Sequence, residues 1–449
     1  MSKKIINIIL SLIYVITLFS GCSVKNQIII KNAGAENDTK LEDKKIKVNW
    51  WSGYGTPERE EAMEKLIEKF TQKYPDITVD YESILGNPIQ KIEASIASGR
   101  EPDVTERGEA FATYLSMGVL EELDSYFDNW EHKNKILPEA IEAARSYDSK
   151  DGKLYYLPIG MGYNVMWIRT DWFSDAKLSL PETWDDVFNS IRVLTDKSKK
   201  QYGTAIRGGD SNWAYLQAMM YSYSGITDYF DENGKPTIND PLHIEFIEKY
   251  LSLYDIYTSE NDINYGWSDV LTAFHSSKAG IIFHNLGSAA EHLAAFKGDT
   301  SKFQGLPYPK SEKGYLVSPL LNPGGHVIYK NSKNKEAAWK LISYISLEGS
   351  EDWCKASIQL PVNTVNYDSV WIKDTPWMRM AAEAMTNPFT KYYESPTYLP
   401  NHSNIMHKTV EPAIQKVMAK RMTAEELCNM WAEIVTNLKE QYDKGIENN

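Results

Sequence analysis

Residues 46–104 read IKVNWWSGYGTPEREEAMEKLIEKFTQKYPDITVDYESILGNPIQKIEASIASGREPDV, and two hydrophobic patterns alternate along this stretch. Apolar residues alternate with polar ones at 46–50 and again at 77–81, as in strands. Apolar residues recur at helical spacing from 57 to Pro75 and from 89 to 96. Val104 then lies in a third short strand. This strand–helix–strand–helix–strand order predicts an α/β fold with a parallel sheet and right-handed crossovers.

The same alternation continues toward the C-terminus. Strands are expected at 155–158, 165–168, 281–283 and 327–329, and helices around 271–274 and 337–345. Two further helices carry capping signals, Thr183 with Asp186 and Thr423 with Glu426. About 428 residues follow the N-terminal leader, which is too long for one core and indicates two lobes of similar size.

The N-terminus has the layout of a secretory signal peptide. Lys3 and Lys4 precede an apolar run at 5–19, which ends in Ser20, Gly21 and Cys22. A cysteine after small residues resembles a bacterial lipobox, so residues 1–21 are predicted to be cleaved and Cys22 to carry lipid. Phe19 departs from the leucine that this pattern favours, and a plain signal peptide or a single membrane anchor is the alternative. The polar stretch 22–44 reads as a flexible tether.

Composition narrows the possible partners. The formal net charge is −13, and removal of two lysines with the leader makes it −15, which disfavours nucleic acid and anionic lipid surfaces. Besides Cys22 there are only Cys354 and Cys428, so a disulfide framework and a cysteine-rich metal site are excluded. Both cysteines are predicted to be small buried side chains.

Five segments together resemble one family. They occur in the chain in this order: Val48-Asn-Trp-Trp-Ser-Gly, IEASIASGREPDV at 92–104, DGKLYYLP at 151–158, TWDDVF at 183–188 and KNKEAAW at 333–339. In this order they resemble the extracellular solute-binding proteins of bacterial ABC importers, in the sugar-binding group that includes maltose-binding protein. The stretch 167–171 departs from the family pattern, in which many relatives have Tyr-Asn before the acidic residue.

The resemblance implies two α/β lobes with a ligand cleft between them. The N-terminal lobe would hold 45–156 plus 320–358, and the C-terminal lobe 157–319 plus 359–449. The implied function is lipid-anchored, extracytoplasmic capture of a sugar, with an oligosaccharide favoured, for the membrane subunits of an ABC permease. The implied protein is a monomer without enzymatic activity, cofactor or metal.

Sugar binding needs flat aromatic faces against C–H patches, and charged or amide groups for the hydroxyls. Such side chains occur at predicted strand ends and in glycine-rich loops, among them 207–213 and 284–287. The candidate ligand-binding residues are Trp51, Glu106, Arg107, Tyr163, Asp210, Trp213, Trp267 and Asn285. Each of them has an alternative role in packing or as a solvated charge.

Two other functions remain open at this point. A secreted carbohydrate hydrolase would need two converging carboxylates, which a sequence cannot reveal. An iron carrier would use adjacent tyrosines, and the pairs Tyr155-Tyr156 and Tyr392-Tyr393 are present, although packing is the expected role of both. No phosphate-binding loop, zinc motif or G-x-S-x-G nucleophile elbow occurs in the chain.

Overall fold

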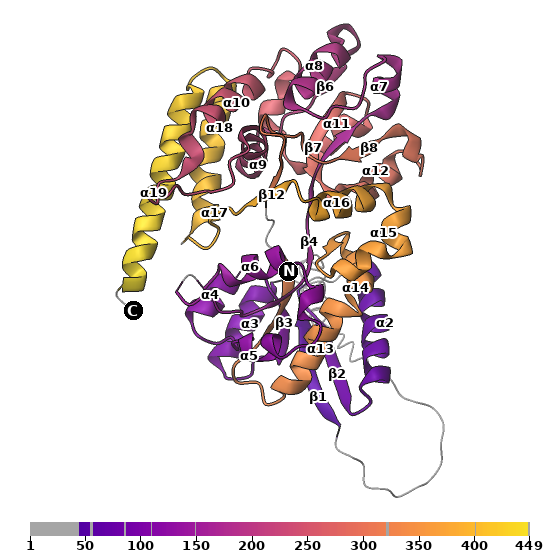
Figure 1. Cartoon of the computed structure of the whole chain (residues 1–449), viewed down its shortest axis with the longest axis vertical. Helices are drawn as coiled ribbons and strands as arrows, with labels where there is room; N and C mark the ends of the chain where they lie inside the picture. Colours follow the sequence, from indigo (N-terminus) through magenta and orange to yellow (C-terminus); the bar gives the residue numbers. More distant parts are fainter. Residues whose placement is uncertain are drawn as a thin grey trace, which may run out of the picture.

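Two β-sheets, one in each lobe, organise the computed structural model of the chain (Figure 1). The structure describes residues 45–53, 57–84, 87–108, 110–148, 150–319, 323–399 and 401–447. The predicted signal peptide at 1–21, the lipidation site Cys22 and the tether at 22–44 lie outside these ranges. Within these ranges, no helix is both long enough and apolar enough to pass through a bilayer.

The first sheet has the strand order β11-β4-β10-β3-β1-β2. Its strands are β1 (Ile46–Ser52), β2 (Ile77–Ser83), β3 (Val104–Glu106), β4 (Leu157–Met161), β10 (Gly324–Ile328) and β11 (Leu360–Pro361). The predicted parallel pairing is confirmed for β1 with β2 and with β3. By contrast, β10 runs antiparallel to both β3 and β4, because it enters this sheet after the chain has passed through the second lobe.

The second sheet has the order β6-β7-β5-β8. Its strands are β5 (Asn164–Ile168), β6 (Tyr202–Thr204), β7 (Ala279–Asn285) and β8 (Gln304–Leu306). Strand β6 is parallel to β7, whereas β5 is antiparallel to β7 and to β8. A separate parallel pair joins β9 (Leu316–Pro319) to β12 (Thr390–Tyr393).

Helices cover both sheets. Those of the first lobe are α2 (Pro57–Lys73), α3 (Pro88–Ala97), α4 (Phe111–Ser116), α5 (Asp124–Asp128), α6 (Pro138–Arg145), α13 (Lys335–Leu347) and α14 (Ser350–Ser357). Those of the second lobe are α7 (Thr170–Asp175), α8 (Trp184–Leu194), α9 (Asn212–Ser224), α10 (Pro241–Leu251), α11 (Trp267–His275), α12 (Ala289–Ala295), α15 (Val370–Asp374), α16 (Pro376–Thr386), α17 (His402–Ile405), η8 (Met406–Val410), α18 (Glu411–Met418) and α19 (Ala424–Glu447).

Both predicted capping pairs are confirmed. Thr183 Oγ1 accepts the amide of Asp186, whose carboxylate accepts the amide of Thr183 in return, at the start of α8. Thr423 and Glu426 exchange the same two hydrogen bonds before α19. These caps satisfy backbone N–H groups that the first helical turn leaves unpaired.

Three apolar clusters form the core. One belongs to the first lobe and surrounds Trp50, and a second fills the C-terminal lobe around Trp184 and Trp431. The third cluster packs residues of α6 against strands and helices of the second lobe around Trp167. It also includes Met161 of β4 and Leu360 of β11, and so joins the two lobes. Cys354 and Cys428 are free and buried, as the sequence predicts, and the structure places them in different clusters.

Candidate functional site

A polar cavity of about 290 Å³ opens where the first sheet meets the crossing strands. Glu106 and Arg107 enter it from the carboxyl end of β3, and Arg59 enters it from the first turns of α2. Gly324 and Gly325 of β10 form part of its wall. Trp353, Ala356, Ser357 and Gln359, from α14 and the residues after it, complete the lining. The cavity therefore lies beside the strands that connect the two lobes.

Glu106 is a buried carboxylate with one unsatisfied oxygen. Its Oε2 accepts the amide of Gly53 at 3.2 Å, whereas Oε1 is buried and has no hydrogen-bond partner among the described residues. Burial raises the pKa of Glu106 to about 7, although hydrogen bonds from the Ser52 hydroxyl and the Gly53 amide oppose that rise. This carboxyl group can therefore accept a hydrogen bond from a hydroxyl group placed in the cavity.

The two arginines of the cavity are held by aromatic rings. The guanidinium carbon of Arg107 lies 4.6 Å from the ring centroid of Tyr147 and 5.1 Å from that of Tyr156. Arg59 lies 5.3 Å from the Trp353 ring and donates from Nη2 to Ser357 Oγ at 2.7 Å. Rings in this arrangement fix the planar donors, so less side-chain entropy is lost when a ligand binds.

Arg107 is also connected to the second lobe. It donates to the hydroxyl of Tyr147, and this hydroxyl lies 3.3 Å from Thr397 Oγ1. Next to it, Ser146 donates to the carboxylate of Glu394. Since residues 394–397 follow β12, these contacts join the end of α6 to the second lobe.

A second group of polar and aromatic side chains lies at the carboxyl ends of β6 and β7. The guanidinium carbon of Arg207 lies 3.9 Å from the ring centroid of Tyr215 and 5.3 Å from that of Trp267. Arg207 is only 7% exposed, and its Nε and Nη2 have no hydrogen-bond partner among the described residues. A buried guanidinium in this state has donors available for an acceptor from outside the protein.

Two residues at the end of β7 extend this group. The His284 ring lies 4.0 Å from that of Trp267 in an edge-on contact, and burial lowers its pKa to about 2, with the charge of Arg207 adding to the effect. His284 is therefore neutral near pH 7. The neighbouring Asn285 has a buried Oδ1 without a partner among the described residues.

The strand directions place the two groups at edges that face each other. β4 leaves the first sheet toward the second lobe, and β1 and β3 run the same way, because β10 is antiparallel to β3 and to β4. In the second sheet β5 runs away from the crossing, so β7 and β6 run back toward it. The carboxyl ends of β3, β6 and β7 therefore point into the region between the lobes, where open α/β sheets place ligands.

The structure distributes the eight candidate residues unevenly. Glu106 and Arg107 line the cavity, and Trp267 and Asn285 belong to the second group. Trp51 lies on the face of the first sheet that α3 covers, with Lys91 Nζ 4.4 Å from its ring centroid. The other three candidates, Tyr163, Asp210 and Trp213, lie outside both groups.

These three residues have other surroundings. Tyr163 is buried in the core cluster that joins the lobes. The Trp213 ring makes edge-on contacts with His402 and His407, and it packs in the core of the second lobe. Asp210 is exposed on the loop before α9.

Arg59, Trp353 and Arg207 are the main additions to the sequence-based prediction. Arg59 could have been found from topology, because the first turn of a helix that follows a strand lies at that strand's carboxyl end. Arg207 begins the glycine-rich loop that the sequence singles out. Trp353 carries no such signal, since it occurs in a helix far along the chain.

The tyrosine pairs considered for iron are engaged in packing. The Tyr393 ring stacks on Tyr221 with centroids 4.3 Å apart, and Tyr392 donates its hydroxyl to the carbonyl of Met385 at 2.8 Å. Tyr156 is fully buried in the first-lobe core, and Tyr155 packs against that core. This geometry gives the iron-carrier interpretation no support.

Comparison with known proteins places the chain in a family. The profile of the bacterial extracellular solute-binding protein family matches residues 55–351. The chain belongs to this family. The two-lobe α/β architecture is the one that its solved structural neighbours share.

Individual solute-binding proteins show how far the similarity extends. A binding protein of Brucella abortus (strain 2308) is 25% identical over 318 residues, which cover 67% of this chain and 72% of the relative. The arabinooligosaccharide-binding protein of Bacillus subtilis (strain 168) is 24% identical over 371 residues, covering 78% and 77%. The structure of the sugar-binding protein MalE from Xanthomonas citri superposes with a TM-score of 0.73 at 16% identity, covering 90% of this chain and 100% of that one.

Proposed function

We propose that this protein is a lipid-anchored receptor outside the cytoplasm that captures a sugar, specifically an oligosaccharide, for an ABC importer. The observation that carries the proposal is that each of two facing strand ends carries a buried polar side chain with unsatisfied hydrogen-bonding atoms. Glu106 presents a free carboxylate oxygen, and Arg207 presents two free guanidinium nitrogens. A molecule rich in hydroxyl groups satisfies an acceptor and a donor at once.

Aromatic rings beside these groups suit the apolar faces of a sugar. Trp353 lines the first-lobe cavity, and Tyr215 and Trp267 flank Arg207. Rings of this kind replace water over C–H patches, while the charged neighbours fix the orientation of the hydroxyls. Two similar proteins, the arabinooligosaccharide-binding protein of Bacillus subtilis and the sugar-binding protein MalE of Xanthomonas citri, support the same ligand class.

Capture would involve closure of the lobes. We assign residues 45–156 plus 320–358 to one lobe and 157–319 plus 359–449 to the other. Because β4 and β11 pair in the first sheet, the chain would cross between the lobes just after β4, between β9 and β10, and just after β11. A ligand that contacts Glu106 and Arg207 together stabilises the closed arrangement, because only that arrangement offers both contacts. The closed protein would then deliver the sugar to the membrane subunits of an ABC permease.

The anchor would be lipid on Cys22 after removal of residues 1–21. Small residues before Cys22 support this assignment, as does the polar stretch 22–44, which would serve as a tether. Metabolic labelling with a palmitate analogue tests it: the wild-type protein should be labelled and membrane-bound, and Cys22→Ala should be unlabelled. Equal labelling of both proteins would contradict the anchor.

Isothermal titration across a panel of oligosaccharides, monosaccharides, amino acids and short peptides tests the ligand class. The proposal predicts saturable binding of at least one oligosaccharide, and assays for new reducing ends should show that it is not cleaved. Cleavage would instead support a hydrolase. Binding of a peptide or an amino acid, with no sugar bound, would refute sugar capture.

A further inference from the structure

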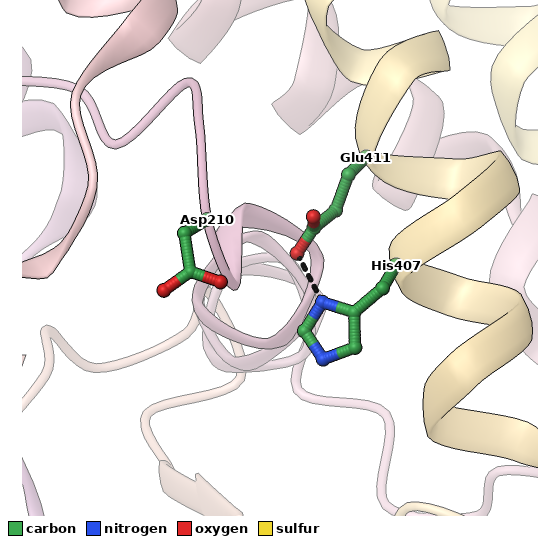
Figure 2. Close-up of side chains that lie close together, drawn as sticks. All are labelled: Asp210, His407 and Glu411. Atoms are coloured by element: carbon green, nitrogen blue, oxygen red, sulfur yellow. Dashed lines mark hydrogen bonds and ion pairs between the residues drawn. The ribbon is translucent and has the colours of Figure 1, made fainter. Parts of the chain in front are cut away.

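Three possible metal ligands from two distant segments meet on the second lobe. Asp210 comes from the loop before α9, whereas His407 and Glu411 lie one helical turn apart where η8 continues into α18 (Figure 2). One ligand atom from each residue lies within 4.8 Å of the other two. The three side chains lie outside the two groups of residues that are assigned to sugar binding above.

Their distances suit a shared ion after small side-chain shifts. His407 Nδ1 lies 2.8 Å from Glu411 Oε1, as the dashed line in Figure 2 shows. Ligand atoms bound to one zinc ion at bond lengths near 2.1 Å are about 3.4 Å apart. The Asp210 side chain is exposed and accepts a long hydrogen bond from Ser211 Oγ at 3.4 Å, and its rotation can bring the carboxylate to that range.

The backbone that carries these ligands is already held together. Asn212, which is 2% exposed, donates from Nδ2 to the carbonyl of Gly208 at 2.8 Å and to the carbonyl of Glu411 at 3.3 Å. The amide of Gly209 donates to the carbonyl of Tyr265 at 2.9 Å. The loop of Asp210 is therefore tied directly to the helix of Glu411, so an ion would not have to order either segment.

Charge at this position also favours a cation. Among the described residues, neither Asp210 nor Glu411 forms an ion pair with a lysine or an arginine, and Glu411 Oε1 instead lies 2.8 Å from His407 Nδ1. Two carboxylates close to a single imidazole carry excess negative charge whenever the imidazole is neutral. A divalent ion would compensate this charge and replace the proton between His407 and Glu411.

The donor set points to a class of metal. One imidazole nitrogen with two carboxylates suits zinc and neighbouring transition ions, whereas calcium and magnesium prefer oxygen donors alone. We propose that Asp210, His407 and Glu411 form a binding site for a divalent transition-metal ion such as zinc. The ion would fasten the 207–211 loop, which also carries Arg207, to the C-terminal helices.

Titration calorimetry with zinc chloride tests the site on protein purified without a polyhistidine tag. The proposal predicts one saturable site in the wild type, and His407→Ala should weaken binding by more than tenfold. Asp210→Asn, an isosteric change on an exposed loop, should also weaken binding while leaving the circular dichroism spectrum unchanged. His132→Ala is the matched control, because His132 Nε2 lies 3.4 Å from Glu131 Oε1 and no third metal-binding side chain joins this pair in the described part of the chain.

Two further readouts distinguish the site from general surface binding. Cobalt added to the wild type should produce a visible absorption band that His407→Ala lacks and His132→Ala retains. Zinc should raise the thermal midpoint of the wild type and leave that of His407→Ala unchanged. The proposal is overturned if zinc does not bind, if His407→Ala and Asp210→Asn bind it as the wild type does, or if calcium binds as tightly as zinc. Sugar titration of the same variants tests the sugar site separately.

Discussion

Glu106 and His326 lie directly opposite each other in the antiparallel pair of β3 and β10. Opposed residues of such a pair point to the same face of a sheet, so both side chains belong to the face that bears the cavity. His326 is fully buried, and neither of its ring nitrogens has a hydrogen-bond partner among the described residues. Burial lowers the pKa of His326 to about 3 and raises that of Glu106 to about 7. The carboxyl end of β3 and the facing part of β10 therefore carry two buried polar groups with unsatisfied atoms, Glu106 and His326, where we propose that the ligand binds.

The raised pKa of Glu106 predicts a specific pH dependence of stability. Because the pKa of Glu106 in the folded protein, about 7, exceeds its ordinary value of 4.5, the folded protein between these pH values holds a proton that the unfolded chain has released. This contribution to stability is complete below pH 4.5 and is lost as the pH rises through 7. Urea unfolding should show a shallower fall between pH 5 and pH 8 for Glu106→Gln than for the wild type. Parallel pH profiles would contradict the assignment.

Removal of the Glu106 carboxylate should weaken sugar binding. A hydrogen bond to a charged group contributes about 1.5–3 kcal/mol, so Glu106→Ala should raise the Kd roughly 10- to 150-fold. Calorimetric titration with the ligand identified in the panel measures the change. Glu93→Ala, on the exposed face of α3, is the control and should leave the Kd unaltered. An unchanged Kd in Glu106→Ala would remove this residue from the site.

We expect Arg207 to increase the affinity for the sugar and to lower the stability of the free protein. Its Nε and Nη2 are buried without partners, and burial of such donors destabilises the free protein. We expect Arg207→Met to keep or raise the thermal midpoint while ligand affinity falls at least tenfold. Arg192→Met, on the exposed side of α8, should change neither quantity. A large loss of stability in Arg207→Met with affinity retained would show that Arg207 has a structural role instead.

The stability of the protein is predicted to depend on Gly325, which lies at the start of β10 in the first sheet. A Cβ at this position would lie 2.3 Å from the carbonyl oxygen of Leu157 and 2.8 Å from Tyr156 Cδ2. Gly325→Ala should therefore lower the free energy of unfolding by about 1–3 kcal/mol. Gly108→Ala is the control, since nothing lies within 4 Å of its added methyl group. Equal stability of the two variants would contradict this account of the strand contact.

The sequence predicts the local features of this fold well, because they depend on neighbouring residues. The strand around Val48, the end of α2 before Pro75 and the two capping boxes all follow from periodicity and turn chemistry. The placement of Glu106 and Arg107 at the cavity follows from the rule that ligands lie at the carboxyl ends of strands.

The aromatic candidates show where such reasoning ends. Alternation places Trp50 and Trp51 on opposite faces of β1, and the structure indeed buries Trp50 completely. It does not reveal that α3 covers the other face, which leaves Trp51 beneath Lys91 rather than in the cavity. Trp213 begins a helix that is buried on almost every side, so no polar stripe distinguishes packing from ligand contact. Contacts of this kind join residues that are distant in the chain, such as Lys91 with Trp51 and His402 with Trp213, so local patterns do not reveal them.

Small-angle X-ray scattering, with and without the ligand identified by titration, tests lobe closure most directly. The account predicts that the radius of gyration falls when a saturating oligosaccharide is added, and that Arg207→Met at the same sugar concentration shows a smaller fall. An unchanged radius of gyration, measured while calorimetry shows the sugar bound, would contradict capture between two closing lobes.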